Sequence, residues 1–90
     1  MKTTRFLSIE TLDGIITLDR AQIINSKNFL IEIKWYYSPF DYDIEKLHSI
    51  VKSQVCVGRN FERTEDYIIF SFPICGIREM KMLQFESDCD

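Results

Sequence analysis

The sequence predicts a single α+β domain over residues 1–90, with one amphipathic helix packed on one face of a mostly antiparallel sheet. Three observations lead to this prediction: an Asp-Gly pair between two apolar runs, an alternating run that enters an aromatic block, and one segment with helical periodicity. A chain of 90 residues has room for one hydrophobic core. We therefore expect two layers and about five to six strands, in the order ββ-β-α-β-β-β.

The N-terminal segment has the signature of a β-hairpin. Residues 5–12 and 15–19 are rich in β-branched and apolar side chains, and Asp13-Gly14 lies between them. Because a tight type I′ turn needs positive φ at both central positions, Asp-Gly between two such runs is a strong hairpin signal.

The chain before the helix holds one ambiguous segment and one clear strand. Residues 19–27 fit either a single helical turn capped by Asp19 or a further strand, and the sequence leaves both open. Apolar and polar residues then alternate over residues 29–37, which predicts a strand with one buried face. The residues predicted to point inward are Phe29, Ile31, Ile33, Trp35 and Tyr37.

One segment has the periodicity of an amphipathic helix. Ser38-Pro39 resembles an N-cap followed by a proline at the first helical position, and Asp41 is placed either to reach back to it or to start the helix itself. Gly58 is the expected stop. The residues that recur at three- and four-residue spacing, and so predict the buried face, are Ile44, Leu47, His48, Val51 and Val55.

The C-terminal third predicts further strands. Residues 67–72 are apolar on both faces, which is typical of a central strand, and Pro73 must end it. The remaining elements are a short strand within 55–63, turns at 64–66 and 75–76, and a final strand over 77–85.

The predicted core lies between the sheet and the helix. From the sheet it takes Phe29, Ile31, Ile33, Trp35, Ile68, Phe70 and Phe72, and from the helix Ile44, Leu47 and Val51. The second face of the sheet is more apolar than a solvated face should be, and the sequence leaves open what covers it. Its predicted members are Leu30, Tyr36, Tyr67, Ile69, Met80 and Met82.

Composition narrows the class of protein. Hydrophobic residues make up 46% and charged residues 28% of the chain, as in globular proteins and unlike disordered or membrane-spanning chains. The first residues show no apolar signal-peptide segment, and the three cysteines are an odd number without close pairing. We expect a cytoplasmic protein, away from membranes, with Cys56, Cys75 and Cys89 as free thiols.

The polar residues do not converge on a recognisable catalytic or metal site. His48 lies at the edge of the predicted helix face, and no cysteine or histidine pair has zinc-ligand spacing. The acidic residues that enter the helix are explained by the helix dipole, and isolated glycines form no phosphate loop. We expect no metal, no cofactor and no catalysis, and a small enzyme centred on His48 is the weakest alternative.

The charge argues against nucleic acid as the main partner. A net charge of −3 forfeits the counterion release that holds proteins on nucleic acid. A local basic groove is the alternative that the sequence leaves, built from Arg59, Arg63, Arg78 and Lys81.

The aromatic block at residues 35–42 is the most unusual feature of the chain. Alternation sends Trp35 and Tyr37 inward, so we predict a partner-binding surface made of the members that remain. These predicted site residues are Tyr36, Phe40 and Tyr42. The other interpretation, that the whole block packs in a thin core, stays open.

These patterns favour a small non-enzymatic module that binds a protein partner or a second copy of this chain. Inhibitors, immunity proteins and phage-type accessory proteins share this profile of size, charge and missing catalytic motifs.

Overall fold

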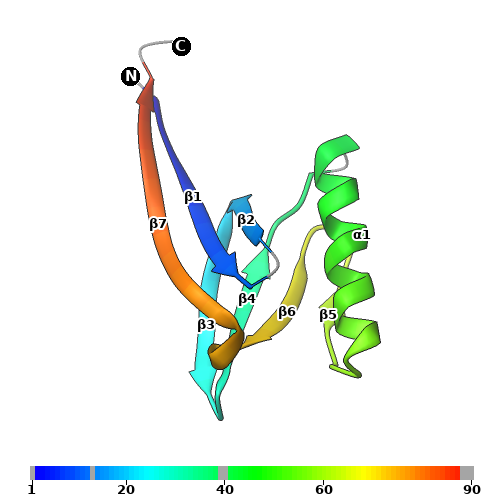
Figure 1. The fold of residues 1–90 in the computed structure, drawn as a ribbon. Helices are drawn as coiled ribbons and strands as arrows, with labels where there is room; N and C mark the ends of the chain where they lie inside the picture. The colour runs from blue at the N-terminus through cyan, green and yellow to red at the C-terminus, as the bar shows by residue number, and fades with distance from the viewer. Residues whose placement is uncertain (1, 13, 39–40, 88–90) are drawn as a thin grey trace.

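The computed structural model describes residues 2–12, 14–38 and 41–87, which form two antiparallel sheets and one long helix (Figure 1). A three-stranded sheet has the strand order β2-β1-β7, and a four-stranded sheet has the order β3-β4-β6-β5. The elements are β1 (Lys2–Thr11), β2 (Gly14–Asp19), β3 (Ala21–Lys27), β4 (Leu30–Trp35), α1 (Asp41–Cys56), β5 (Glu62–Arg63), β6 (Ile68–Pro73), the 3₁₀ turn η1 (Ile74–Gly76) and β7 (Ile77–Ser87).

The α+β class and the antiparallel pairing are confirmed, but the prediction of a single sheet is wrong. The described residues contain seven strands in two sheets, where we expected about five to six in one. The difference arises because β1 pairs with β7, at the other end of the chain, along a register that runs from Lys2↔Ser87 to Thr11↔Ile77. Because these two strands lie at opposite ends of the chain, no short stretch of the sequence predicts that they pair.

The N-terminal hairpin is confirmed, with its turn shifted by one residue. Thr11 pairs with Gly14, and the Thr11 hydroxyl donates to the Gly14 carbonyl at 3.0 Å. Gly14 therefore follows the turn instead of forming its centre. Its φ of +141° still requires glycine's conformational freedom.

The ambiguous segment is a strand, and the chain changes sheets immediately before it. Arg20 lies between β2 and β3 with a φ of +54°, and its carbonyl accepts the Tyr36 N–H at 3.0 Å. β3 then pairs with β4 through a turn at Asn28 and Phe29, which also have positive φ. Phe29 is 85% exposed there, so its predicted place in the core is wrong. The alternation that predicted a buried Phe29 holds only from Leu30, where β4 begins, because Phe29 belongs to the turn.

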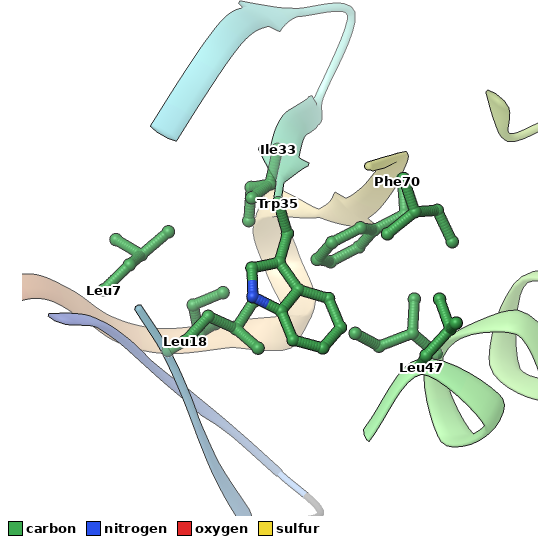
Figure 2. Packing of buried hydrophobic residues seen from close by; sticks show 9 residues of the cluster. Leu7, Leu18, Ile33, Trp35, Leu47 and Phe70 are labelled. Carbon is green, nitrogen blue, oxygen red and sulfur yellow. The ribbon is translucent and has the colours of Figure 1, made fainter. Parts of the chain in front are cut away.

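A single core fills the space between the two sheets and the helix (Figure 2). Trp35 is fully buried at its centre, and its Nε1–H has no hydrogen-bond partner among the described atoms. The buried members that the sequence predicts are Ile33, Trp35, Leu47, Ile68 and Phe70. The buried members that it misses are Leu7, Ile9, Leu18 and Ile50. The missed residues lie mainly on β1 and β2. We expected the helix alone to cover the sheet, whereas the three-stranded sheet also packs against the core.

Helix α1 spans Asp41–Cys56, and Pro39 of the Ser38-Pro39 signal lies outside the described residues. Its stop at Gly58 is confirmed, because the Arg59 and Gly58 N–H groups bond back to Gln54 and Val55 in a glycine C-cap. No helix among the described residues is long and apolar enough to cross a membrane.

The buried face of α1 is rotated from the predicted one. Its buried residues are Asp43, Leu47, Ile50 and Gln54, while Ile44 and Val51 are half-buried. Val55 is 64% exposed and His48 is also exposed, so neither belongs to the core. Two polar residues occupy core-facing positions because each bonds a backbone or charged group that the helix covers.

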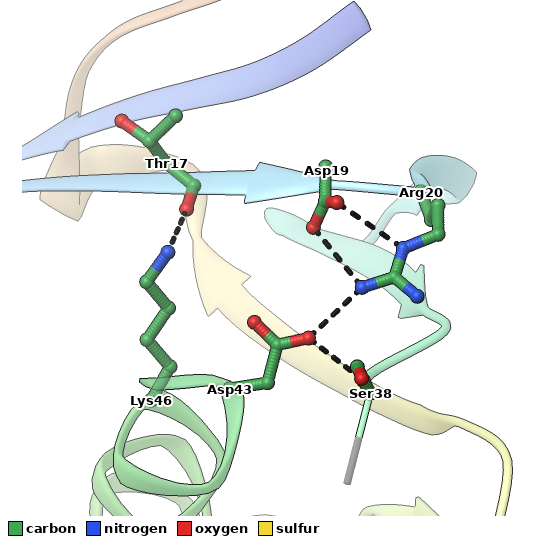
Figure 3. A network of polar contacts seen from close by, with 6 residues as sticks. All are labelled: Thr17, Asp19, Arg20, Ser38, Asp43 and Lys46. Atoms are coloured by element: carbon green, nitrogen blue, oxygen red, sulfur yellow. Dashed lines mark hydrogen bonds and ion pairs between the residues drawn. The ribbon is translucent and has the colours of Figure 1, made fainter. Parts of the chain in front are cut away.

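At its N-terminal end, α1 is held by an ion pair (Figure 3). Asp43 Oδ2 accepts Arg20 Nη2 at 2.9 Å and the Ser38 N–H at 2.7 Å. The Arg20 guanidinium also contacts the neighbouring Asp19 carboxylate, at the end of β2. Asp43, one of the acidic residues that the sequence explains by the helix dipole, thus also makes a specific, partly buried contact.

At its C-terminal end, α1 is held by an amide. Gln54 Nε2 donates to the Ser71 carbonyl at 2.8 Å, and the Ser71 N–H donates back to Gln54 Oε1 at 3.3 Å. β5 pairs with β6 only at Ile68 and Ile69, so the β6 edge is free of β5 at Ser71. The Gln54 side chain therefore acts as the missing strand partner.

We predict that Gln54→Ala lowers the free energy of unfolding by about 2–4 kcal/mol, because it leaves the buried Ser71 N–H without a partner, removes one of the two hydrogen bonds to the Ser71 carbonyl and opens a cavity. Urea denaturation measures this loss. Ser53→Ala, at an exposed position one residue earlier, is the control and should change it by less than about 0.5 kcal/mol. Equal losses in both variants would contradict the role of the amide.

Candidate functional site

The face of the four-stranded sheet that points away from the core, here called the outer face, carries the candidate site. In the β4–β6 register Lys34 lies across from Ile69 and Glu32 across from Ser71, between the inward pairs formed by Ile33 with Phe70 and Trp35 with Ile68. Alternation therefore assigns Glu32, Lys34 and Tyr36 to one face. Tyr36 is 40% exposed, so this face is open to solvent at the end of β4.

Two tyrosines and a lysine form a compact group on the outer face. The Tyr36 and Tyr67 rings meet edge to face with centroids 5.8 Å apart. The Lys34 ammonium lies 5.0 Å from the Tyr36 centroid and 4.3 Å from the Tyr67 centroid. Tyr67 donates its hydroxyl to Glu62 Oε2 at 3.2 Å, which ties the group to β5. We call Lys34, Tyr36, Glu62 and Tyr67 the tyrosine cluster.

Hydrogen bonding, burial and charge together raise the pKa of two members of the tyrosine cluster. The polar contact with Tyr36 raises the pKa of Lys34 despite some desolvation, so Lys34 is an ammonium at neutral pH. Burial raises the pKa of Tyr67 above its ordinary value, and the Glu62 carboxylate raises it further. Lys34 acts in the opposite direction on the Tyr67 pKa. The cluster thus holds a cation over two neutral phenol rings.

A hollow of about 670 Å³ adjoins the tyrosine cluster. It lies between β4, β6 and the segment that follows α1, where Arg59 Nη1 donates to the Ser71 carbonyl at 3.3 Å. Glu32 also lines it and accepts Asn25 Nδ2 at 3.4 Å. The lining residues are Leu30, Glu32, Arg59, Asn60, Phe61, Glu62, Ile69, Phe70 and Ser71. Apolar, acidic and basic groups are mixed in this lining.

Of the three site residues that the sequence predicts, Tyr36 lies in the tyrosine cluster. Phe40 lies outside the described residues, and so does the side chain of Tyr42, whose backbone belongs to α1. Trp35 and Tyr37 point inward as predicted, and the Tyr37 hydroxyl donates to the Thr64 carbonyl. The sequence interpretation missed Lys34 and Glu62. Lys34 could have been found, because alternation sets it on the same face as Tyr36.

The predicted second face is divided between the two sheets. Leu30, Tyr36, Tyr67 and Ile69 belong to the four-stranded sheet, whereas Met80 and Met82 lie on β7. Met82 pairs with the buried Leu7, so the methionines share the core side of the other sheet. They are not part of the outer face.

The four basic residues of the alternative groove fall on two sheets. Arg59 and Arg63 flank or belong to β5, while Arg78 and Lys81 belong to β7. No single basic surface collects all four.

The remaining candidates stand apart from one another. His48, Cys56 and Cys75 are exposed, and both of these cysteines are free. Within residues 2–12, 14–38 and 41–87, no three His, Cys, Asp or Glu side chains lie close enough to hold a metal ion. Cys89 lies outside the described residues.

Comparison with protein-family models, with curated proteins and with solved structures gave no match.

We predict opposite shifts in the Tyr67 pKa from two charge-removing variants. Glu62→Gln should lower it, because the carboxylate disfavours the tyrosinate, and Lys34→Met should raise it, because the ammonium favours the tyrosinate. NMR titration of the Tyr67 ring, assigned with Tyr67→Phe, measures both. Shifts of the same sign, or no shift, would show that these charges do not face the phenol in solution.

Proposed function

We propose that this chain is a non-enzymatic interaction module that binds a partner protein through its outer face. The observation that supports this most is the tyrosine cluster: a solvent-exposed ring held edge to face against a second ring, with an ammonium over both. Tyrosines are enriched in binding hot spots because they bury a large apolar area at low entropic cost and keep a polar tip.

The cluster is ordered before any partner binds. Tyr67 is fixed by its bond to Glu62, and Tyr36 is fixed by that ring and by its backbone bond to Arg20. A surface whose side chains are already ordered loses little conformational entropy on association. The adjacent hollow offers room for a side chain of the partner.

The acidic residues around the hollow and the net negative charge favour a protein over a nucleic acid as the partner. Glu32 and Glu62 line the hollow beside the tyrosines, where a phosphate backbone would have to pass. The net charge of −3 adds a long-range repulsion. Phe40 and Tyr42 stay predicted members of the binding surface, and an inhibitor, immunity or phage-type accessory protein stays the predicted type.

A photo-cross-linking amino acid at position 36, and separately at position 67, identifies the partner in extracts of the source cells. We expect both positions to capture the same protein and Lys52, at an exposed helix position, to capture none of it. With that protein purified, Tyr36→Ala should weaken binding by about thirtyfold or more, as expected for a hot spot worth about 2 kcal/mol.

Thermal melts separate binding from folding in this experiment. Tyr36→Ala should unfold close to the unsubstituted chain, and Phe40→Ala and Tyr42→Ala decide whether the aromatic block extends the surface. Lys52→Ala is the matched control and should bind normally. If all three aromatic variants are unstable, or if binding survives Tyr36→Ala, the outer face is not the binding surface.

We also predict no binding to single- or double-stranded nucleic acid tighter than about micromolar at physiological salt. Fluorescence anisotropy with labelled oligonucleotides measures it. A strong, salt-sensitive signal would contradict the proposal of a protein partner, and substitutions at Arg59, Arg63, Arg78 and Lys81 would then locate the contacts.

A further inference from the structure

Three of the four sheet edges are protected against pairing with another strand. β5 has two residues, and β3 carries a bulge between Ile23 and Asn25. The side chain of Lys46 on α1 reaches β2, where its Nζ donates to the Thr17 carbonyl at 2.9 Å (Figure 3). Short length, bulges and coverage are the means by which proteins prevent edge-to-edge association.

The fourth edge, that of β7, is long, and its bulge lies near its start, where Arg78 is the extra residue between Ile77 and Glu79 in the pairing with β1. β7 has 11 residues without proline or glycine, and among the described residues β1 is its one strand neighbour. Its pairing with β1 is regular from Lys2↔Ser87 to Glu10↔Glu79. This leaves a long row of backbone donors and acceptors directed away from β1.

The same strand also forms an arm that β2 does not support. β2 pairs with β1 only from Phe6 to Thr11, while β1 and β7 continue together from Arg5↔Gln84 to Lys2↔Ser87. The two strands run on toward the chain ends apart from the rest of the fold (Figure 1). A two-stranded ribbon is at best marginally stable in water, so a further strand beside β7 would stabilise the arm.

We propose that β7 pairs antiparallel with β7 of a second copy, around a two-fold axis at Met82. Met82 is the central residue of β7 and lies within its regular stretch from Glu79 to Ser87, and in this register the arm of each copy lies beside the first half of its partner's β7. The two three-stranded sheets become one six-stranded sheet, β2-β1-β7-β7-β1-β2. This inference is independent of the proposed function, which uses the other sheet.

Charge and burial select this register. A shift of the axis to position 81 would oppose two lysines, and an axis at position 80 would leave both arms uncovered. Met82 is 53% exposed on the core side of its sheet, so a second Met82 across the axis would extend the core.

Analytical ultracentrifugation of the full chain, from about micromolar to about millimolar concentration, tests the dimer. We expect the mass to rise from 10.7 kDa toward twice that value. Met82→Lys should move the monomer–dimer midpoint to at least about tenfold higher concentration, because it sets two ammonium groups opposite each other. Ile15→Lys, at a 67% exposed position on β2, is the control and should leave the midpoint unchanged.

Disulfide trapping tests the register. In a chain with all three native cysteines changed to serine, Met82→Cys should form a cross-linked dimer, since facing antiparallel residues have Cα atoms about 4.5–5.5 Å apart. Gln84→Cys is the control, because the two copies of that residue would be about 13 Å apart. A chain that stays monomeric at every concentration overturns the dimer, and cross-linking of Gln84→Cys as fast as Met82→Cys overturns the register.

Discussion

The change of sheets at Arg20 is the constraint on which the rest of this fold depends. The residue adopts a φ of +54°, so β2 ends in one sheet and β3 begins in the other without a loop between them. Its guanidinium holds Asp43 of α1, and its carbonyl accepts the Tyr36 N–H. A left-handed conformation is unfavourable for a residue with a Cβ, and these contacts offset its cost. One residue thereby connects both sheets and the helix.

The helix completes the core at the side where the two sheets diverge. Asp43 anchors one of its ends and Gln54 the other, and Leu47 and Ile50 pack between them. Because both anchors are buried polar groups with specific partners, they fix which face of α1 turns inward. An apolar face alone would allow the helix to rotate toward Val55, which instead stays exposed. The polar contacts therefore set the helix orientation, and the apolar residues supply most of the burial.

The core forms on one face of the four-stranded sheet, and this arrangement leaves open the two surfaces that we propose for binding, the outer face and the edge of β7. The helix and the three-stranded sheet both cover the same face of the four-stranded sheet, so its outer face stays open and presents the tyrosine cluster. β7 lies at the far edge of the other sheet, so a partner on either surface does not occupy the other. The two surfaces also differ in chemistry: the outer face offers rings and charges, whereas β7 offers backbone groups.

The sequence by itself determined the local elements: the Asp-Gly hairpin, the alternation of Ile33 and Trp35, and the helix stop at Gly58. These follow from turn chemistry, period-two burial and glycine's freedom, which act over a few residues. Within the candidate site, alternation likewise predicted that Tyr36 points outward.

Only the tertiary structure decided what depends on distant partners. The pairing of β1 with β7, the place of Phe29 outside the core and the joining of Lys34 and Tyr36 to Tyr67 are of this kind. Each brings together groups far apart in the chain, or lets a turn override a local pattern. The free energy that selects them comes from burial and hydrogen bonding across the whole fold, which no short window of sequence contains.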